Sequence, residues 1–298
     1  MKKRIAVSGA TGWLGRETIE KLSLSLPLEN LVLYSSNGRN IENNAGASLP
    51  TESFLPANPS DSLEGLIHLA FLTRDKVEAV GFSDFVSINM SLISKACAMI
   101  EESKPRWIVL VSSGAIFDRN SGELETDIMR NPYGFCKRIE EALVLQSAQK
   151  VGANVVIGRL WGATGEFMPF NSAYAVSDFI QTAHTKEKIV IKSGGSVIRR
   201  YVDAGEFIEV LVKAAANGEN ITINSGGTKI EIGKLAELVA GHFPSIEIVR
   251  PVQDNSLDDY FPRDSDFEIL AARVGVTLSD LQTQVYRTVK GHIAAFCD

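Results

Sequence analysis

The sequence predicts an α/β protein: a doubly wound parallel sheet joined to a smaller, interwoven C-terminal α/β domain. A short apolar run at residues 5–7 leads into a glycine-rich turn, and a helix-like segment then extends as far as Pro27. Strand-like and helix-like segments alternate through the first half, as is typical of parallel strands joined by crossover helices. This pattern loosens after Gly165, which indicates that a second domain begins there.

The glycine-rich turn, SGATGWLG at residues 8–15, places Gly9, Gly12 and Gly15 at three-residue spacing. Glycine permits a tight turn and lets backbone N–H groups approach a ligand closely. The helix that follows directs the positive end of its dipole at the same place. Strand, glycine turn and helix in this order are typical of a site for a dinucleotide pyrophosphate, although the spacing is GxxGxxG rather than GxGxxG. The alternative is a plain turn without a ligand.

The remaining elements follow from apolar runs between turn-forming residues. In the first half, strands are expected at 31–34, 53–55, 66–70, 107–111 and 155–157, helices at 85–100 and 132–151, and a surface loop at 37–59. In the second half, helices are expected at 173–185, 204–217, 232–241, 266–274 and 278–294, and strands at 189–191, 197–202 and 221–223. The expected domains are a dinucleotide-binding domain at 1–165, with parts of about 197–226 returning to it, and a mainly substrate-binding domain at 166–298.

The composition is that of an ordinary globular protein, with 45% hydrophobic and 22% charged residues among 298. The net charge of −6 provides no basic surface for nucleic acid. There is no run of about 20 apolar residues, and no long apolar run precedes the glycine turn, so neither a membrane span nor a signal peptide is expected. The scattered cysteines, Cys97, Cys136 and Cys297, indicate a reducing cytoplasm and do not have metal-binding spacing.

Tyr133 and Lys137 lie four residues apart at the start of a helix that Asn131 caps and Pro132 begins. A cation one turn away and the positive helix end both favour the phenolate, so we expect a lowered pKa at Tyr133 and an acid/base role. Ser113 ends an apolar strand about twenty residues earlier, where ligands of open α/β sheets bind. The alternative is a surface tyrosine and lysine.

Two further residues are interpreted as structural. His68 lies in an apolar strand and is expected to be a core or strand-end histidine rather than a catalytic one. Cys136 lies inside the YGFCK segment, and without an adjoining His or Cys it is expected to be a small packing residue.

Taken together, the motifs make the chain similar to the extended short-chain dehydrogenase/reductase family, particularly its nucleotide-sugar epimerases, dehydratases and ketoreductases. The matching stretches are SGATGWLG (8–15), LIHLA (66–70), the helix with Asn89, VLVSSGAIF (109–117), YGFCK (133–137), GRLWGATG (158–165) and RRYVDAGEF (199–207). The resemblance implies a Rossmann fold and a homodimer formed through the two long helices. It also implies that Ser113 bonds the substrate oxygen, Tyr133 is the acid/base, Lys137 holds the nicotinamide ribose and Asn89 supports the proton relay.

The expected cofactor is NADP, with NAD as the alternative. NAD sites of this kind place an acid at the end of the second strand, but here that end reads YSSNGR, so hydroxyls and Arg39 are available for a 2′-phosphate. The expected cofactor-binding residues are Gly9, Thr11, Gly12, Trp13, Leu14, Gly15, Ser35, Ser36, Arg39, Leu69, Ala70 and Lys137. No metal is expected.

The substrate-binding residues expected by resemblance are Arg199 or Arg200, with Arg263 as a further candidate for the diphosphate. The chain departs from the family pattern at Gly162, where Asn is frequent, and at Thr164, where Tyr is usual. The leading hypothesis is a 4-ketoreductase or 4-epimerase acting on a nucleoside-diphosphate sugar. Two alternatives stay open: a reductase of another small carbonyl compound, and a non-catalytic NAD(P)-sensing protein.

Overall fold

The computed structural model describes residues 4–36, 38–54, 63–119, 121–170, 174–252, 255–262 and 266–297. The chain forms two compact units, and the chain passes between them more than once. The first comprises Met1–Leu160 and Ile208–Asn224, and the second comprises Trp161–Phe207 and Ser225–Asp298.

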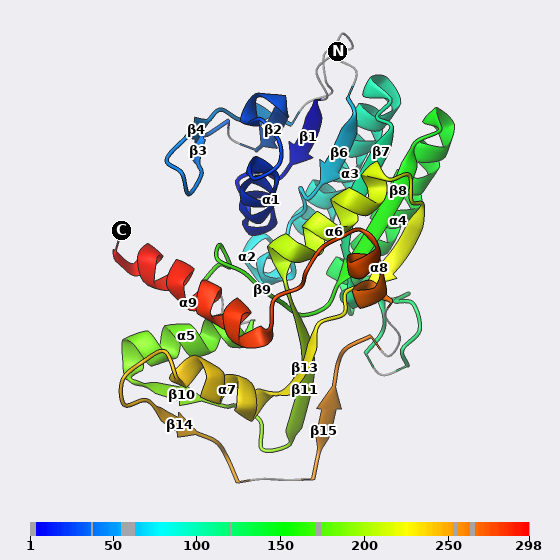
Figure 1. Ribbon diagram of the computed structural model, residues 1–298. Helices are drawn as coiled ribbons and strands as arrows, with labels where there is room; N and C mark the ends of the chain where they lie inside the picture. Colours follow the sequence, from blue (N-terminus) through cyan, green and yellow to red (C-terminus); the bar gives the residue numbers. More distant parts are fainter. Residues whose placement is uncertain are drawn as a thin grey trace. The chain divides into compact units, whose positions relative to one another are not determined.

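The described residues of the first unit form a seven-stranded sheet whose pairings are all parallel (Figure 1). The strand order is β12-β8-β7-β6-β1-β2-β5, so the chain winds outward in both directions from β1. The strands are β1 (Ile5–Ser8), β2 (Leu31–Ser35), β5 (Glu52–Ser53), β6 (Gly65–His68), β7 (Trp107–Ser113), β8 (Asn154–Leu160) and β12 (Ile221–Asn224). This order confirms the predicted doubly wound sheet, and it places the switch point between β1 and β6.

One face of this sheet packs against α3 (Phe82–Ser103) and α4 (Pro132–Val151), which lie side by side (Figure 1). Leu66 and Leu110 on the strands share a buried cluster with Met99 of α3 and Val144 of α4. Strand residues that alternate with this set, such as Val109, are also fully buried, as expected of a parallel sheet covered on both faces. Burying a large apolar side chain contributes roughly 1.5–3 kcal/mol, so this core is a major source of stability.

Two further helices of the first unit approach each other across an ion pair. Lys21 of α1 (Trp13–Ser23) lies 3.9 Å from Glu209 of α6 (Ala204–Ala216). A short α2 (Val77–Val80) precedes α3, and a hairpin of β3 (Ile41–Glu42) and β4 (Ser48–Leu49) occupies part of the predicted 37–59 loop. A strand of only two residues is too short to show the alternation of apolar and polar residues by which a strand is recognised in a sequence.

The start of α4 is fixed by the predicted cap. The Asn131 Oδ1 accepts a hydrogen bond from the Gly134 N–H at 2.9 Å, and its Nδ2 donates to the Ala115 carbonyl at 2.9 Å. A Cβ at Gly134 would collide with the Ala115 carbonyl oxygen, so the absence of a side chain allows the helix to approach this turn. The turn is the short 3₁₀ helix η3 (Gly114–Ile116), which directly follows β7. The cap therefore determines where Tyr133 lies relative to Ser113.

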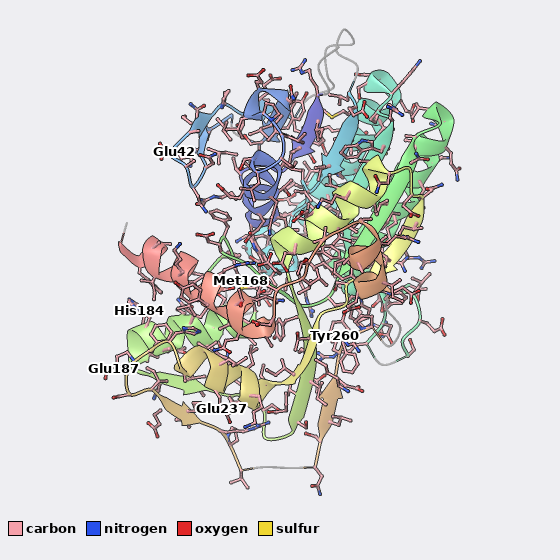
Figure 2. The ribbon with its side chains drawn as sticks, in the orientation of Figure 1. Glu42, Met168, His184, Glu187, Glu237 and Tyr260 are labelled. Carbon is pink, nitrogen blue, oxygen red and sulfur yellow. The ribbon has the colours of Figure 1, made fainter. Side chains whose placement is uncertain are left out.

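The second unit is organised around β11 (Ser196–Asp203), which pairs antiparallel with β13 (Thr228–Glu231) and parallel with β15 (Leu257–Asp259) and β9 (Ala163–Thr164). A separate pair joins β10 (Lys188–Val190) to β14 (Glu247–Val249). The helices are α5 (Ala175–Lys186), α7 (Ile232–Ala240), α8 (Phe267–Arg273) and α9 (Leu281–Cys297). Figure 2 labels His184 of α5, whose ring stacks on that of Phe296 of α9 with centroids 4.0 Å apart.

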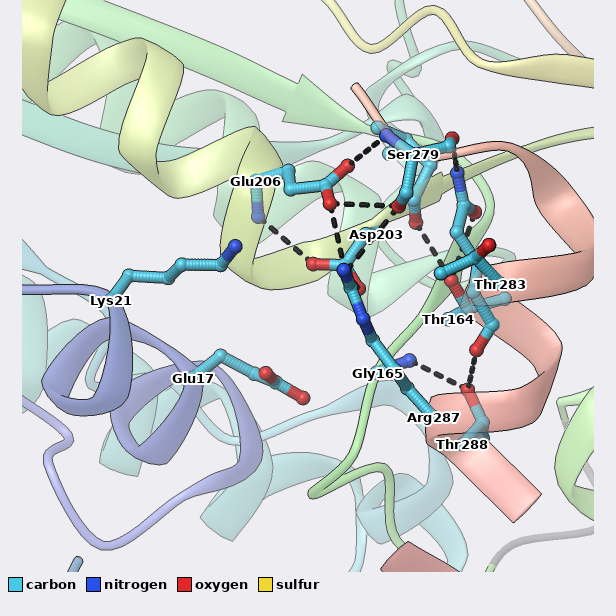
Figure 3. Close-up of polar contacts among 12 residues, drawn as sticks. Glu17, Lys21, Thr164, Gly165, Asp203, Glu206, Ser279, Thr283, Arg287 and Thr288 are labelled. Carbon is cyan, nitrogen blue, oxygen red and sulfur yellow. Dashed lines mark hydrogen bonds and ion pairs between the residues drawn. The ribbon is translucent and has the colours of Figure 1, made fainter. Parts of the chain in front are cut away.

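A buried polar network ties the end of β11 to α9 within this unit (Figure 3). The Asp203 carboxylate accepts a hydrogen bond from the Glu206 N–H at 2.9 Å. The Glu206 carboxylate accepts from the Ser279 hydroxyl at 2.7 Å and from the Arg287 guanidinium at 2.8 Å. Arg287 also pairs with Asp203 at 3.3 Å, so one guanidinium compensates two buried carboxylates. This network gives both acids of the RRYVDAGEF segment a structural role.

No helix in the described part of the chain is both long enough and apolar enough to cross a membrane.

Candidate active site

The glycine turn has the geometry of an anion cradle. Gly9 has a φ of +74°, and a Cβ there would lie 2.8 Å from the Ala70 nitrogen. A Cβ at Gly15 would lie 2.5 Å from the Ala10 carbonyl oxygen, so α1 packs directly on the turn. Gly12 is the N-cap of α1, and no side-chain cap hydrogen bond satisfies this helix end. A helix N-terminus without a side-chain cap favours an anion, and the close-packed glycines give the turn a shape that fits a dinucleotide pyrophosphate.

The predicted residues after β6 adjoin this cradle. The Leu69 and Ala70 N–H groups donate to the Ser8 Oγ at 3.1 Å and 3.3 Å, which joins the ends of β1 and β6. Asn89 is fully buried on α3, accepts from the Leu72 N–H at 2.8 Å and donates to the Leu72 carbonyl at 3.4 Å. Asn89 therefore anchors the segment that follows β6.

At the end of β2, the predicted polar residues differ in their surroundings. The Ser35 hydroxyl is buried, lies 2.7 Å from the Thr51 hydroxyl and accepts from the Gly38 N–H at 2.9 Å. It shapes the turn, whereas Ser36 and Arg39 are exposed. Thr11 is exposed, and Trp13 and Leu14 in the first turn of α1 are half-buried.

Ser113 and Tyr133 come together where β7 ends. The two side chains share a hydrogen bond, and the Ser113 Oγ also accepts from the Ala115 N–H at 3.1 Å. The Tyr133 ring meets the Phe71 ring edge-on, with centroids 5.7 Å apart. Burial raises the pKa of Tyr133 to about 12, although the hydrogen bond with Ser113 opposes the shift. The direction of the shift expected from the sequence is therefore wrong for this structure.

Burial is the largest cause of the raised pKa of Tyr133, and Lys137, the cation expected to lower it, is paired with Glu140. Its Nζ is buried, donates to the Val111 carbonyl at 2.9 Å and to the Glu140 carboxylate at 2.8 Å, and lies 3.9 Å from the centre of the Phe71 ring. An opposite charge in direct contact cancels most of the field that the ammonium would exert on Tyr133.

Glu140 and Phe71 are the residues that the sequence argument missed. The Glu140 carboxylate lies between Lys137 and His68, whose Nε2 is 3.2 Å from the Glu140 Oε1. Because Glu140 follows Lys137 by three residues on one helix face, the spacing could have identified this pair. The His68 contact was not accessible from spacing, since the two residues lie on different elements. His68 is buried in the core, as expected.

In the second unit, the two predicted arginines lie on β11 and have different partners. The Arg199 guanidinium pairs with the Asp258 carboxylate at 2.8 Å. The Arg200 guanidinium lies 5.8 Å from the centre of the Phe261 ring, and its Nε is buried without a hydrogen-bond partner among the described residues. Lys229, the partner of Arg200 in the β11–β13 register, lies 4.9 Å from the same ring. Arg263 lies outside the described residues.

The departures from the family pattern have local causes. A Cβ at Gly162 would collide with the Arg200 carbonyl oxygen, and the Gly162 carbonyl accepts from the Val202 N–H at 3.2 Å. Thr164 is buried, and its hydroxyl lies 3.1 Å from the Gln284 Oε1. Both positions are therefore occupied by contacts within the second unit.

Residues 5–233 match the profile of the family described as NAD dependent epimerase/dehydratase. The chain belongs to this family. It is therefore an NAD-dependent enzyme with a Rossmann-type sheet, and the resemblance to extended short-chain dehydrogenases/reductases is confirmed.

Individual relatives are distant in sequence. UDP-glucuronic acid decarboxylase 3 of Arabidopsis thaliana is 21% identical over 289 residues, which cover 88% of this chain and 81% of that protein. The structure of UDP-N-acetylglucosamine 4-epimerase from Methanobrevibacter ruminantium M1 has a TM-score of 0.75 at 18% identity, covering 99% of this chain and 100% of that one. The structure of MoeE5 in complex with UDP-glucose and NAD has a TM-score of 0.74 at 18% identity. The match covers 98% of this chain and 99% of MoeE5. These structures share the fold of this chain.

The packing of the glycine turn gives a first prediction. Gly15→Ala inserts a methyl group against two backbone carbonyls, which cannot move aside as a side chain could. Overpacking of this kind costs about 1–3 kcal/mol, so we expect a lower Tm and at least about tenfold weaker dinucleotide binding. Thermal denaturation and a fluorescence titration with NADP and NAD measure these two effects.

Gly241→Ala is the matched control, because a Cβ there would lie no closer than 3.5 Å to the nearest atom. Gly241→Ala should leave the Tm and the affinity for the dinucleotide unchanged. Native Tm and native affinity in Gly15→Ala would show that the turn does not need to be this compact.

Proposed function

We propose that this enzyme acts on a nucleoside-diphosphate sugar, as a 4-ketoreductase or 4-epimerase, by hydride transfer assisted by Tyr133, Lys137 and Ser113. The observation that carries the proposal is the hydrogen-bonded pair of Ser113 and Tyr133 at the carboxyl end of β7, in the same compact unit as the glycine cradle. Ligands of doubly wound sheets bind beyond this edge of the sheet.

The residues of the cradle would hold the cofactor. The N–H groups at the start of α1 and the backbone at Gly9, Gly12 and Gly15 would bind the pyrophosphate, with Leu69 and Ala70 beside them. A nicotinamide bound there supplies or accepts the hydride. Lys137 would contact the ribose and Ser113 would bind the substrate oxygen, while Tyr133 would give a proton to that oxygen or take one from it. Asn89 would support the proton relay through the segment it anchors.

The substrate assignment rests on the second unit and on the relatives. Arg200 and Lys229 place two cations around one aromatic ring, and the unsatisfied Nε of Arg200 is suited to an anionic oxygen. The relatives include a UDP-glucuronic acid decarboxylase and a UDP-N-acetylglucosamine 4-epimerase, whose names specify substrates that carry a diphosphate. We assign the binding of such a diphosphate to Arg200. Arg199 and Arg263 are the other candidates for this role.

We also propose a cytoplasmic homodimer formed through α3 and α4. These helices pack against each other, and each presents a large apolar side chain to solvent, Ile88 on α3 and Leu143 on α4. A second copy of the pair would cover both side chains.

A preference for NADP over NAD is a prediction of this proposal. The sequence at the end of β2, YSSNGR, contains no acidic residue to bind a ribose 2′-hydroxyl, while Ser36 and Arg39 are exposed there. We expect kcat/KM to be higher with NADP(H), and Arg39→Ala to reduce that preference several-fold. Equal values for the two cofactors, or a preference for NAD, would contradict it.

Replacement of Tyr133 tests the chemical step. Tyr133→Phe removes only the hydroxyl, so kcat should fall about 10²–10⁴-fold, the usual contribution of positioned acid/base catalysis. Cofactor affinity should stay close to that of the native enzyme, because the variant leaves the glycine cradle intact. Steady-state kinetics and a cofactor titration give the two measurements.

Tyr201→Phe is the matched control, since burial raises the pKa of Tyr201 to about 12 as well, but Tyr201 lies on β11. It should retain native kcat. A Tyr133→Phe enzyme with near-native kcat, when chemistry limits the rate, would remove Tyr133 from the mechanism.

The two arginines of β11 provide a paired test of the substrate class. Arg200→Ala should raise the KM for the nucleotide-sugar by about 10–100-fold, as expected when a charge-assisted hydrogen bond worth about 1.5–3 kcal/mol is lost. Arg199→Ala should have a smaller effect on KM, because Asp258 already occupies that guanidinium. If neither variant changes KM, a substrate without a diphosphate becomes the better hypothesis.

A further inference from the structure

The segment that follows β6 joins the glycine turn to Tyr133 and Lys137 within the first unit. At one end, the Ala70 backbone packs so closely on the turn that a Cβ at Gly9 would lie 2.8 Å from the Ala70 nitrogen. The next residue is Phe71, whose ring meets the Tyr133 ring edge-on. The centre of the Phe71 ring lies 3.9 Å from the Lys137 Nζ. Phe71 therefore connects the proposed pyrophosphate site to the proposed catalytic pair.

Hydrogen bonds hold the backbone on both sides of Phe71. The Ala70 N–H donates to the Ser8 Oγ at 3.3 Å, and the Leu72 N–H donates to the Asn89 Oδ1 at 2.8 Å. Asn89 is fully buried, so its amide is itself fixed by the surrounding core. With the backbone held in this way, the Phe71 ring changes its position by rotation about its own side-chain bonds.

The Phe71 ring covers the side of the Lys137 ammonium that its two hydrogen bonds leave open. An ammonium group has three N–H donors, and Lys137 directs one at the Val111 carbonyl at 2.9 Å and one at the Glu140 carboxylate at 2.8 Å. The ring lies against the remaining side at a distance typical of a cation–π contact. Since the Lys137 side chain is only 5% exposed, a ribose hydroxyl reaches the Nζ only by displacing this ring.

The surroundings of Phe71 differ from those of a core phenylalanine. Phe85, on the neighbouring helix α3, is 0% exposed, as expected of a ring that serves only the core. Phe71 is half-buried, so solvent borders part of its ring, and the ring contacts a phenol and an ammonium. A ring in this position has space into which it can turn when a ligand takes its place.

We propose that Phe71 is a specificity-determining residue of the cofactor site, because its ring and the nicotinamide ribose compete for the Lys137 ammonium. The inference rests on the proposed function in taking Lys137 as the residue that holds this ribose. A site that is open in only a fraction of the molecules loses apparent affinity by that fraction. Phe71 therefore weakens the binding of ligands that carry the ribose, and it leaves ligands that end at the diphosphate unaffected.

This competition bears on the type of reaction. A ketoreductase passes the hydride of the reduced cofactor to its substrate and must then exchange the oxidised cofactor for a reduced one. A 4-epimerase returns the hydride to the same sugar and can keep its cofactor bound. Because Phe71 lowers the affinity for the dinucleotide, it suits exchange and favours the 4-ketoreductase of the two reactions proposed above.

Calorimetric titration of the whole protein tests the competition with two pairs of ligands. NADP is compared with adenosine 2′-phosphate 5′-diphosphate, and NAD with ADP, so that each pair differs by the nicotinamide and its ribose. Phe71→Ala should bind both dinucleotides about tenfold more tightly than the native protein does, while its affinities for the two diphosphates change by less than about twofold. Equal or weaker binding of both dinucleotides by Phe71→Ala would overturn the proposal.

Phe117→Ala is the matched control, because the Phe117 ring also faces a cation, with its centre 5.3 Å from the Arg159 guanidinium carbon. This variant should leave all four affinities unchanged. If Phe71→Ala does not fold, Phe71→Leu keeps an apolar side chain and removes only the aromatic face. Phe71→Leu should show a smaller gain in dinucleotide affinity, and the absence of any gain would overturn the proposal in the same way.

A double-mutant cycle shows whether the gain depends on the ammonium, and it separates this inference from the proposed function. Lys137→Met is combined with Glu140→Met, so that no buried charge is left unpaired. This double variant should bind both dinucleotides more weakly and the diphosphates normally, and adding Phe71→Ala to it should bring no gain. A gain that persists without the ammonium would overturn the competition.

The remaining outcomes distinguish the two proposals. If removal of Lys137 weakens dinucleotide binding but Phe71→Ala brings no gain in the native background, the inference about Phe71 fails and the proposed role of Lys137 stands. If removal of Lys137 leaves dinucleotide binding unchanged, the proposed role of Lys137 fails, and the competition fails with it. If the native protein binds the diphosphates but Phe71→Ala is needed before either dinucleotide binds, both proposals are supported.

Discussion

The buried ion pair of Glu140 and Lys137 is the interaction on which the arrangement of this active site depends. Through it α4 is bonded to the Val111 carbonyl of β7, and the Glu140 carboxylate lies 3.2 Å from His68 of β6, whose other ring nitrogen lies 2.6 Å from the Ser8 hydroxyl of β1. Breaking a buried pair by removing one partner typically costs about 3–5 kcal/mol, because the other charge is left uncompensated. The elements that present Tyr133, Ser113 and the glycine turn are therefore held together by charges that also influence the protonation of Tyr133.

Much of the first unit could be predicted because its signals are local. The β7 strand is a continuous apolar run, the Asn131–Pro132 cap fixes the start of α4, and the glycines mark a turn that tolerates no side chain. The pKa of Tyr133 could not be predicted in the same way. The helical spacing of Tyr133 and Lys137 suggested a cation beside a phenol, but the burial that raises the pKa of Tyr133 is set by tertiary packing.

The second unit was harder to predict because its strands are short and its interactions connect distant segments. The sequence indicated that an arginine pair lies on a strand at 197–202, but successive residues of a strand point to opposite faces. Only the partners distinguish them: Asp258 holds Arg199, while Arg200 lies by Phe261 and Lys229. Likewise, Gly162 departs from the family pattern because the β11 backbone occupies the space of a side chain.

We propose above all that one chain binds a nicotinamide dinucleotide and a nucleotide-sugar together. Native mass spectrometry of the purified protein, mixed in turn with NADP or NAD and a panel of UDP-sugars that includes UDP-glucuronic acid, tests this claim most directly. We expect a complex that retains one dinucleotide and one nucleotide-sugar per chain, and we expect Arg200→Ala to lose the nucleotide-sugar while keeping the dinucleotide. A protein that retains the dinucleotide but binds no nucleotide-sugar of the panel would contradict it.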